Sequence, residues 1–175
     1  MRRTLVLGGA RSGKSAHAEG LLTDAPATYV ATARVDPADV EWTARIAEHV
    51  ERRPPKWRTV ELAEPAELGP LLEQATGPVL VDDVATWLTT LLDDAGAWDG
   101  GSLDPVRHAC AALADGLGAS RAEVVLVSAE VGLGVVPATR SGRLFRDQLG
   151  SLNAALADRC TDVVLLVAGI PLRLR

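Results

Sequence analysis

The chain has 175 residues, of which 47% are hydrophobic, and its formal net charge at neutral pH is −5. This length predicts one well-filled domain over residues 1–175. The acidic balance, with no long basic stretch, argues against a nucleic-acid partner, which requires clustered Lys and Arg. No apolar run approaches the roughly 18 residues that span a bilayer, so we expect no membrane insertion. Cys110 and Cys160 lack metal-ligand spacing and suggest buried thiols in a reducing compartment, so the cytoplasm is the expected location.

The first predicted element is a buried strand over residues 4–8, and a phosphate-binding motif follows it. Residues 8–15 read G-x-x-x-x-G-K-S and precede a predicted helix over 15–22, which is the context of a P-loop rather than of a chance glycine-rich turn. In such a loop Lys14 reaches the β- and γ-phosphates, and the hydroxyl of Ser15 ligates Mg²⁺. Lys14 is also one of only two lysines in a chain that otherwise uses arginine. The predicted nucleoside triphosphate contacts are Gly8, Gly9, Ala10, Arg11, Ser12, Gly13, Lys14 and Ser15.

Short apolar runs alternate with helical patterns along the rest of the chain. The apolar runs predict further buried strands at 27–32, 78–82, 123–128 and 162–167. Helical spacing of apolar residues predicts helices at 37–52, 65–74 and 141–157, and the Gly- and Asp-rich stretch 93–105 is expected to be a surface loop. This alternation indicates an α/β domain with a mostly parallel sheet and helices on both faces.

The predicted strand at 78–82 ends in two acids. P-loop proteins present a Mg²⁺-organising carboxylate at such a strand end, beside the serine of the phosphate loop. We therefore predict that Asp82 takes part in metal binding. For Asp83 we expect a capping or solvated role at the helix that begins near Thr86.

The three histidines differ in their sequence surroundings. His17 and His108 lie in helical patterns and are expected to be packing or surface residues. His49 lies among arginines, and an imidazole there can attack phosphorus while a neighbouring arginine neutralises charge. The residues alone leave a structural role for His49 open. They also do not decide which of three candidate arginines would act: Arg52, Arg53 and Arg58.

Four segments of the chain together resemble a known protein family. They read TLVLGGARSGKSAHAE from residue 4, RIAEHVERRPPKWRTVE from 45, VLVDDVATWLTTLL from 79, and VVLVSAEVGLGVVP onward from 124. In this order and spacing the chain closely resembles the bifunctional adenosylcobinamide kinase / adenosylcobinamide-phosphate guanylyltransferase family of cobalamin biosynthesis. The most specific part is E-V-G-x-G-V-V-P…R-x-F-R-D over residues 130–147, which generic P-loop kinases lack.

The resemblance implies a RecA-like P-loop NTPase fold, a homotrimer and two reactions. ATP or GTP phosphorylates adenosylcobinamide on its aminopropanol hydroxyl. GMP from GTP then passes to adenosylcobinamide phosphate through a guanylylated histidine, which falls on His49, and gives adenosylcobinamide-GDP. The implied guanine nucleotide contacts, besides residues 8–15, are Thr32, Ala33, Arg34, Val50, Glu51, Arg52, Arg53, Glu61 and Asp82.

Two positions depart from the family pattern. Val50 stands where the family usually has lysine, and Asp83 adds an acid where the family often has the sequence D-C-L-T. Both changes leave Lys14, Ser15 and His49 intact, so we interpret them as adjustments of the site that do not remove either activity. Two alternatives remain open from the sequence. One is a monofunctional kinase of a small metabolite, and the other is a RecA-like nucleotide-binding module without chemistry of its own.

Overall fold

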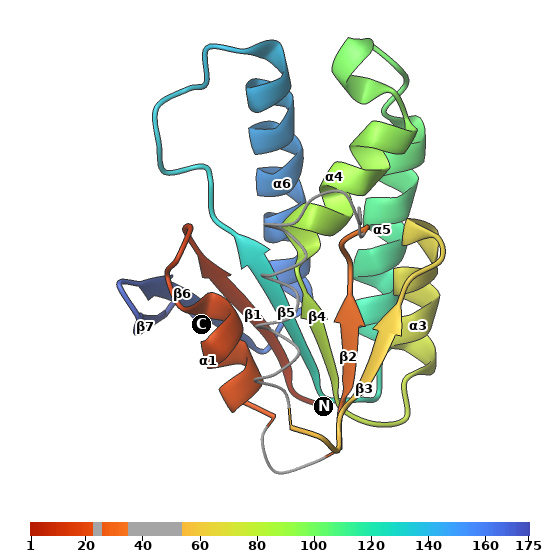
Figure 1. The fold of residues 1–175 in the computed structure, drawn as a ribbon, viewed down its shortest axis with the longest axis vertical. Helices are drawn as coiled ribbons and strands as arrows, with labels where there is room; N and C mark the ends of the chain where they lie inside the picture. The colour runs from red at the N-terminus through yellow and green to blue at the C-terminus, as the bar shows by residue number, and fades with distance from the viewer. Residues whose placement is uncertain (23–25, 35–53) are drawn as a thin grey trace.

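A seven-stranded sheet forms the centre of the computed structural model, which describes residues 1–22, 26–34 and 54–175 (Figure 1). The strand order is β3-β2-β4-β5-β1-β6-β7, and neighbouring strands are parallel except for the antiparallel pair β6 and β7. The strands are β1 (Arg3–Gly8), β2 (Thr28–Ala31), β3 (Arg58–Glu61), β4 (Val79–Asp82), β5 (Val124–Ala129), β6 (Asp162–Val167) and β7 (Ile170–Arg173).

Helices cover both faces of this sheet, as the sequence predicted. One face carries α1 (Lys14–Gly20), and the other carries a layer of further helices (Figure 1). That layer consists of α3 (Leu68–Gln74), α4 (Val84–Asp94), α5 (Asp104–Ala119) and α6 (Arg140–Arg159), with short 3₁₀ turns η1 (Pro65–Glu67) and η2 (Ala97–Asp99). None of the described helices is long and apolar enough to cross a membrane.

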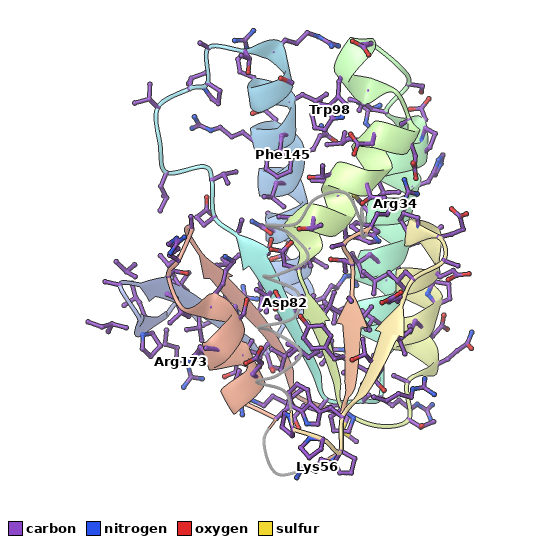
Figure 2. All side chains as sticks on the ribbon, viewed as in Figure 1. Arg34, Lys56, Asp82, Trp98, Phe145 and Arg173 are labelled. Carbon is purple, nitrogen blue, oxygen red and sulfur yellow. The ribbon has the colours of Figure 1, made fainter. Side chains whose placement is uncertain are left out.

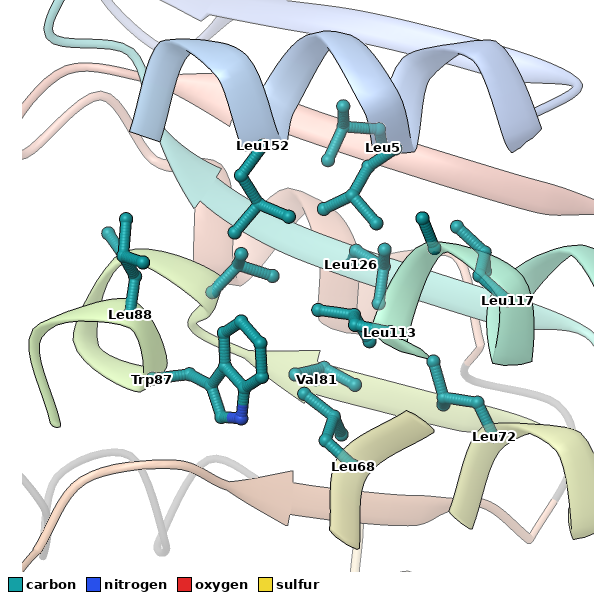
Figure 3. Packing of buried hydrophobic residues seen from close by; sticks show 14 of the residues in the cluster. Leu5, Leu68, Leu72, Val81, Trp87, Leu88, Leu113, Leu117, Leu126 and Leu152 are labelled. Carbon is teal, nitrogen blue, oxygen red and sulfur yellow. The ribbon is translucent and has the colours of Figure 1, made fainter. Parts of the chain in front are cut away.

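The central strands are apolar because both of their faces are buried. Along β1, Leu5 points into the larger core under α3 to α6, whereas Val6 points into the smaller core under α1. The larger core packs Trp87, Leu113 and other fully buried side chains against the sheet (Figure 3). Because successive side chains of a strand point to opposite faces of the sheet, one continuous apolar run contributes side chains to both cores.

All five strands predicted from apolar runs are present, with ends that differ by at most one residue. The predictions missed β3 and β7, which form the two edges of the sheet and are largely exposed. The loop expected at 93–105 contains η2, and α5 begins at its end. The helix predicted at 37–52 lies outside the described residues.

Burial also explains the behaviour of the two cysteines. Both are free thiols, and burial raises the pKa of Cys110 to about 11 and that of Cys160 to about 12. At neutral pH both therefore remain protonated and weakly nucleophilic. Cys160 is buried as predicted, whereas Cys110 is only partly buried.

Candidate nucleotide-binding site

The phosphate loop, residues 8–15, connects the end of β1 to the start of α1. Gly13 has φ of 88° immediately before the helix, a left-handed conformation that strongly favours glycine. Gly8 is required for a different reason, because an added Cβ would collide with the side chain of Ser12. The motif glycines at both ends of the loop are thus explained by the backbone path that the loop takes.

Strand order brings the loop close to the acidic end of β4. Only β5 separates β1 from β4, so the two carboxyl ends lie about 10 Å apart at usual strand spacing. Ser15, in the first turn of α1, spans this gap, and its Oγ donates to Asp82 Oδ1 at 3.2 Å. The predicted metal pair is therefore in direct contact.

Tyr29, on β2, completes the surroundings of Asp82. Its hydroxyl donates to Asp82 Oδ2 at 3.1 Å, so that each carboxylate oxygen has a protein partner. The sequence analysis missed Tyr29, because a tyrosine inside an apolar strand gives no signal beyond core packing. These contacts fix the orientation of the carboxylate before any ligand binds.

The oxygens of Ser15 and Asp82 suit Mg²⁺, a hard cation that prefers oxygen ligands. Among the described residues no group of three or more His, Cys, Asp or Glu could hold a metal ion by itself. Lys14 Nζ lies back over the loop, 3.4 Å from the carbonyl oxygen of Gly9.

Asp83 caps α4, as the sequence analysis expected. Its Oδ1 accepts from the backbone N–H of Thr86 at 2.7 Å. The peptide bond between Asp82 and Asp83 is cis. Thr32 Oγ1 donates to the carbonyl oxygen of Asp83 at 2.7 Å and accepts from its N–H at 3.0 Å, which joins the ends of β2 and β4.

A pocket of about 400 Å³, here called the Arg34 pocket, opens beyond the ends of β2 and β3. Four of the nucleotide contacts implied by the family resemblance line it together: Thr32, Ala33, Arg34 and Glu61. The sequence analysis missed the remaining lining residues, which are Leu62, Ala63, Pro65, Trp87 and Thr90. Trp87 is fixed there by its Nε1, which donates to the carbonyl oxygen of Pro65 at 2.8 Å.

Arg34 is held by a two-pronged ion pair. Its two terminal nitrogens donate to the two carboxylate oxygens of Asp94, at 2.6 and 2.7 Å. Figure 2 labels Arg34 beyond the end of β2. The ion pair raises the pKa of Arg34 and lowers the pKa of Asp94. Because Asp94 is the last residue of α4, the pair ties the rim of the Arg34 pocket to that helix.

The remaining predicted site residues fall into two groups. Arg58 begins β3, at the end opposite Glu61, so it does not lie at the carboxyl edge of the sheet with the phosphate loop, and its role in the transfer stays a prediction. His49, Val50, Glu51, Arg52 and Arg53 lie outside the described residues. Of the other histidines, His108 is exposed on α5 as expected, and His17 is part of α1.

A second pocket, of about 310 Å³, adjoins the phosphate loop itself. We call it the phosphate-loop pocket. Its walls come from three parts of the chain, namely loop residues 9–12, residues Glu130 and Leu133 after β5, and residues 165–168 around the end of β6. The phosphate loop thus has open space beside it, lined from the segment after β5 and from the end of β6.

Comparison with known proteins extends over almost the whole chain. The family model described as cobinamide kinase / cobinamide phosphate guanyltransferase matches residues 4–174. The chain is 43% identical to the bifunctional adenosylcobalamin biosynthesis protein CobP of Pseudomonas aeruginosa, over 99% of this chain and 97% of that protein. It is 40% identical to the bifunctional adenosylcobalamin biosynthesis protein CobU of Escherichia coli K12, over 98% of each.

Solved structures show the same fold at low sequence identity. A type III secretion ATPase from pathogenic bacteria aligns with a TM-score of 0.53 at 12% identity, over 95% of this chain and 51% of that one. A Pyrococcus horikoshii OT3 protein aligns with a TM-score of 0.50 at 11% identity, over 98% of this chain and 85% of that one. These similarities confirm the RecA-like α/β fold predicted from the sequence.

Proposed function

The chain belongs to the cobinamide kinase / cobinamide phosphate guanyltransferase family, and from this premise we propose that it carries out both reactions. It phosphorylates adenosylcobinamide with ATP or GTP, and then transfers GMP from GTP to adenosylcobinamide phosphate to give adenosylcobinamide-GDP. The observation that carries this proposal is the family match over residues 4–174. The match includes a phosphate loop whose serine contacts a strand-end carboxylate.

In the kinase reaction the phosphate loop binds and orients the triphosphate. The loop backbone surrounds the phosphates, and Lys14 balances their negative charge. Ser15 and Asp82 would hold Mg²⁺, which supplies charge neutralisation at the phosphate oxygens when it is bound. Tyr29 keeps the carboxylate of Asp82 turned toward Ser15. Because phosphoryl transfer depends mainly on positioning, these residues supply most of what the reaction needs.

In the guanylyl transfer, His49 acts as the nucleophile. An imidazole nitrogen attacks the α-phosphorus of GTP, the bond to the β-phosphate oxygen breaks, and pyrophosphate leaves. A phosphate oxygen of adenosylcobinamide phosphate then attacks the same phosphorus and releases the histidine. The Arg34 pocket supports guanine nucleotide binding, because it presents a cation and the acceptor Glu61 on one surface. Val50, Glu51, Arg52 and Arg53 are the further proposed contacts.

We also propose that the protein is a cytoplasmic homotrimer in which residues 1–175 act as one catalytic domain. The exposed edge strand β7 supports a subunit contact, since Ile170 is 70% exposed and Leu172 is 54% exposed. Sedimentation equilibrium tests the assembly. A trimeric mass is expected, and a monomeric mass at micromolar concentration would contradict this part of the proposal.

Two assays with the wild-type protein separate the proposed function from its alternatives. The first follows transfer of γ-³²P from ATP to adenosylcobinamide, and the second follows α-³²P from GTP to adenosylcobinamide phosphate. We expect product in both. Product in the first alone would indicate a monofunctional kinase, and nucleotide binding without product in either would indicate a binding module.

A further inference from the structure

The segment 130–139, which connects β5 to α6, exposes an unusual amount of apolar surface. Leu133 is 81% exposed, Val135 94% and Val136 64%. Figure 1 shows this segment leaving the end of β5 and running away from the sheet before it joins α6. One exposed aliphatic side chain needs no explanation, but several within four residues are typical of a binding surface.

Polar contacts hold both ends of this segment. Arg146 Nη2 donates to the carbonyl oxygen of Gly132 at 2.8 Å. Arg143 Nη1 donates to the carbonyl oxygens of Pro137 and Ala138, at 3.0 and 2.7 Å. Both arginines belong to the R-x-F-R-D part of the sequence motif, so the two halves of that motif meet here. The contacts tie the backbone to α6, while the aliphatic side chains between the tethers remain in solvent.

The start of the segment is fixed in the same way and faces the phosphate loop. Glu130 Oε1 accepts from the backbone N–H of Gly132 at 2.6 Å. Glu130 and Leu133 then form one wall of the phosphate-loop pocket, opposite residues 9–12. Ser12 lines this pocket too, is only 7% exposed, and its Oγ is buried without a hydrogen-bond partner in the described part of the chain. An unpartnered buried hydroxyl at a pocket wall is suited to a polar group of a ligand.

This geometry bears on how a large acceptor can reach the phosphate loop. Phosphoryl transfer requires the acceptor hydroxyl close to the transferred phosphate and in line with the leaving oxygen. A corrinoid with its peripheral side chains is much larger than a pocket of about 310 Å³. Only a side arm can enter the pocket, so the ring must rest on the surface around the pocket mouth.

We propose that Leu133, Val135 and Val136 form the surface on which the corrinoid ring of the acceptor rests while its hydroxyl-bearing arm enters the phosphate-loop pocket. The ring carries methyl groups that pack against branched aliphatic side chains. The location is set by Leu133, which belongs both to the pocket wall and to the exposed surface. This inference rests on the proposed function, because it takes cobinamide as the acceptor.

The test is steady-state kinase kinetics with adenosylcobinamide and ATP on the Leu133→Ser, Val135→Ser double variant. We expect the KM for adenosylcobinamide to rise about tenfold or more, because two apolar contacts are lost. The KM for ATP and kcat should change less than twofold, since the phosphate loop itself is intact. The matched control is the Leu133→Met, Val135→Ile double variant, which keeps aliphatic surface and should keep a KM near that of wild type.

Equilibrium dialysis measures the loss of adenosylcobinamide binding directly. It is done without nucleotide, and the visible absorbance of the corrinoid reports its concentration on each side of the membrane. A serine double variant that binds adenosylcobinamide as wild type does, or keeps its KM, would overturn the inference. A changed sedimentation coefficient in that variant would also overturn it, because the surface would then be an interface between copies of the chain. Wild-type protein that does not phosphorylate adenosylcobinamide at all would instead overturn the proposed function.

Discussion

The phosphate loop and the Arg34 pocket lie at the same edge of the sheet but are built in different ways. Around the phosphate loop, Ser15, Tyr29 and Asp82 come from three elements and are joined by partly buried hydrogen bonds. At the Arg34 pocket, the guanidinium is held by an ion pair that solvent reaches, with side chains 57% and 42% exposed. The first region is fixed before ligand binding, whereas the second depends on exposed charges that a nucleotide can rearrange. Substitutions should therefore have larger effects in the first region than in the second.

The largest expected effect is that of Lys14→Ala. It removes the ammonium that balances charge on the β- and γ-phosphates, so both reactions should slow by about 10²- to 10³-fold or more. Single-turnover assays of each reaction at saturating nucleotide measure this loss. Kinase turnover close to wild type would show that the loop does not bind the transferred phosphates.

The two neighbouring acids, Asp82 and Asp83, should respond differently to the same substitution. Asp82→Asn removes a carboxylate that contacts Ser15, and we expect a loss of about 10- to 100-fold in kinase activity with a higher Mg²⁺ requirement. Asp83→Asn keeps a side chain that caps helices well, so activity should change less than about threefold. Titration with Mg²⁺ measures both variants. Equal damage from the two would mean that both acids serve the metal.

A smaller effect is expected from Tyr29→Phe. The change removes one hydrogen bond to Asp82 but keeps the buried ring, so kinase kcat/KM should fall about 3- to 10-fold. The apparent affinity for Mg²⁺ should fall together with kcat/KM. A lower Mg²⁺ affinity distinguishes a role of Tyr29 in orienting Asp82 from a role in packing. An unchanged Mg²⁺ dependence together with a lower thermal unfolding midpoint would assign Tyr29 to packing alone.

The smallest effect is expected at the Arg34 pocket. Asp94→Asn frees Arg34, and exposed ion pairs contribute little because solvent screens them, so the KM for GTP in guanylyl transfer should change by no more than about fivefold. The kinase KM for ATP should stay constant. Asp115→Asn, which removes another exposed ion pair on α5, is the matched control and should leave both values unchanged. If the KM for ATP in the kinase reaction rose as much as the KM for GTP in the transfer, Arg34 would contribute to both reactions.

The same contrast between buried and exposed regions explains how much of the structure the sequence could predict. Central strands were predictable because burial on both faces leaves a continuous apolar run. The edge strands lack that signal, since β3 is largely polar and β7 contains Pro171 with every residue exposed. For the candidate site, the meeting of Ser15 and Asp82 followed from a motif and a strand end. The contact of Tyr29 with Asp82 depends on strand order, which no local pattern encodes.

The tethers from α6 give a similar example. The motif over residues 130–147 was recognisable as a family feature, but the sequence did not show that Arg143 and Arg146 hold the backbone of the segment before them. Those contacts join residues five to fourteen positions apart, and their geometry depends on where α6 begins. The position of Arg58 has the same origin, because it follows from the edge strand β3, which was not predicted from the sequence.

The most direct test of the central claim is covalent labelling of the protein by α-³²P-GTP, followed by denaturing electrophoresis. We expect acid-labile, alkali-stable label on wild type and on the His17→Ala and His108→Ala variants, because these two histidines have no proposed role in transfer. His49→Ala should carry no label yet keep part of its adenosylcobinamide kinase activity, which shows that the variant is folded. Label that persists on His49→Ala, or a wild-type protein that never becomes labelled, would contradict the account.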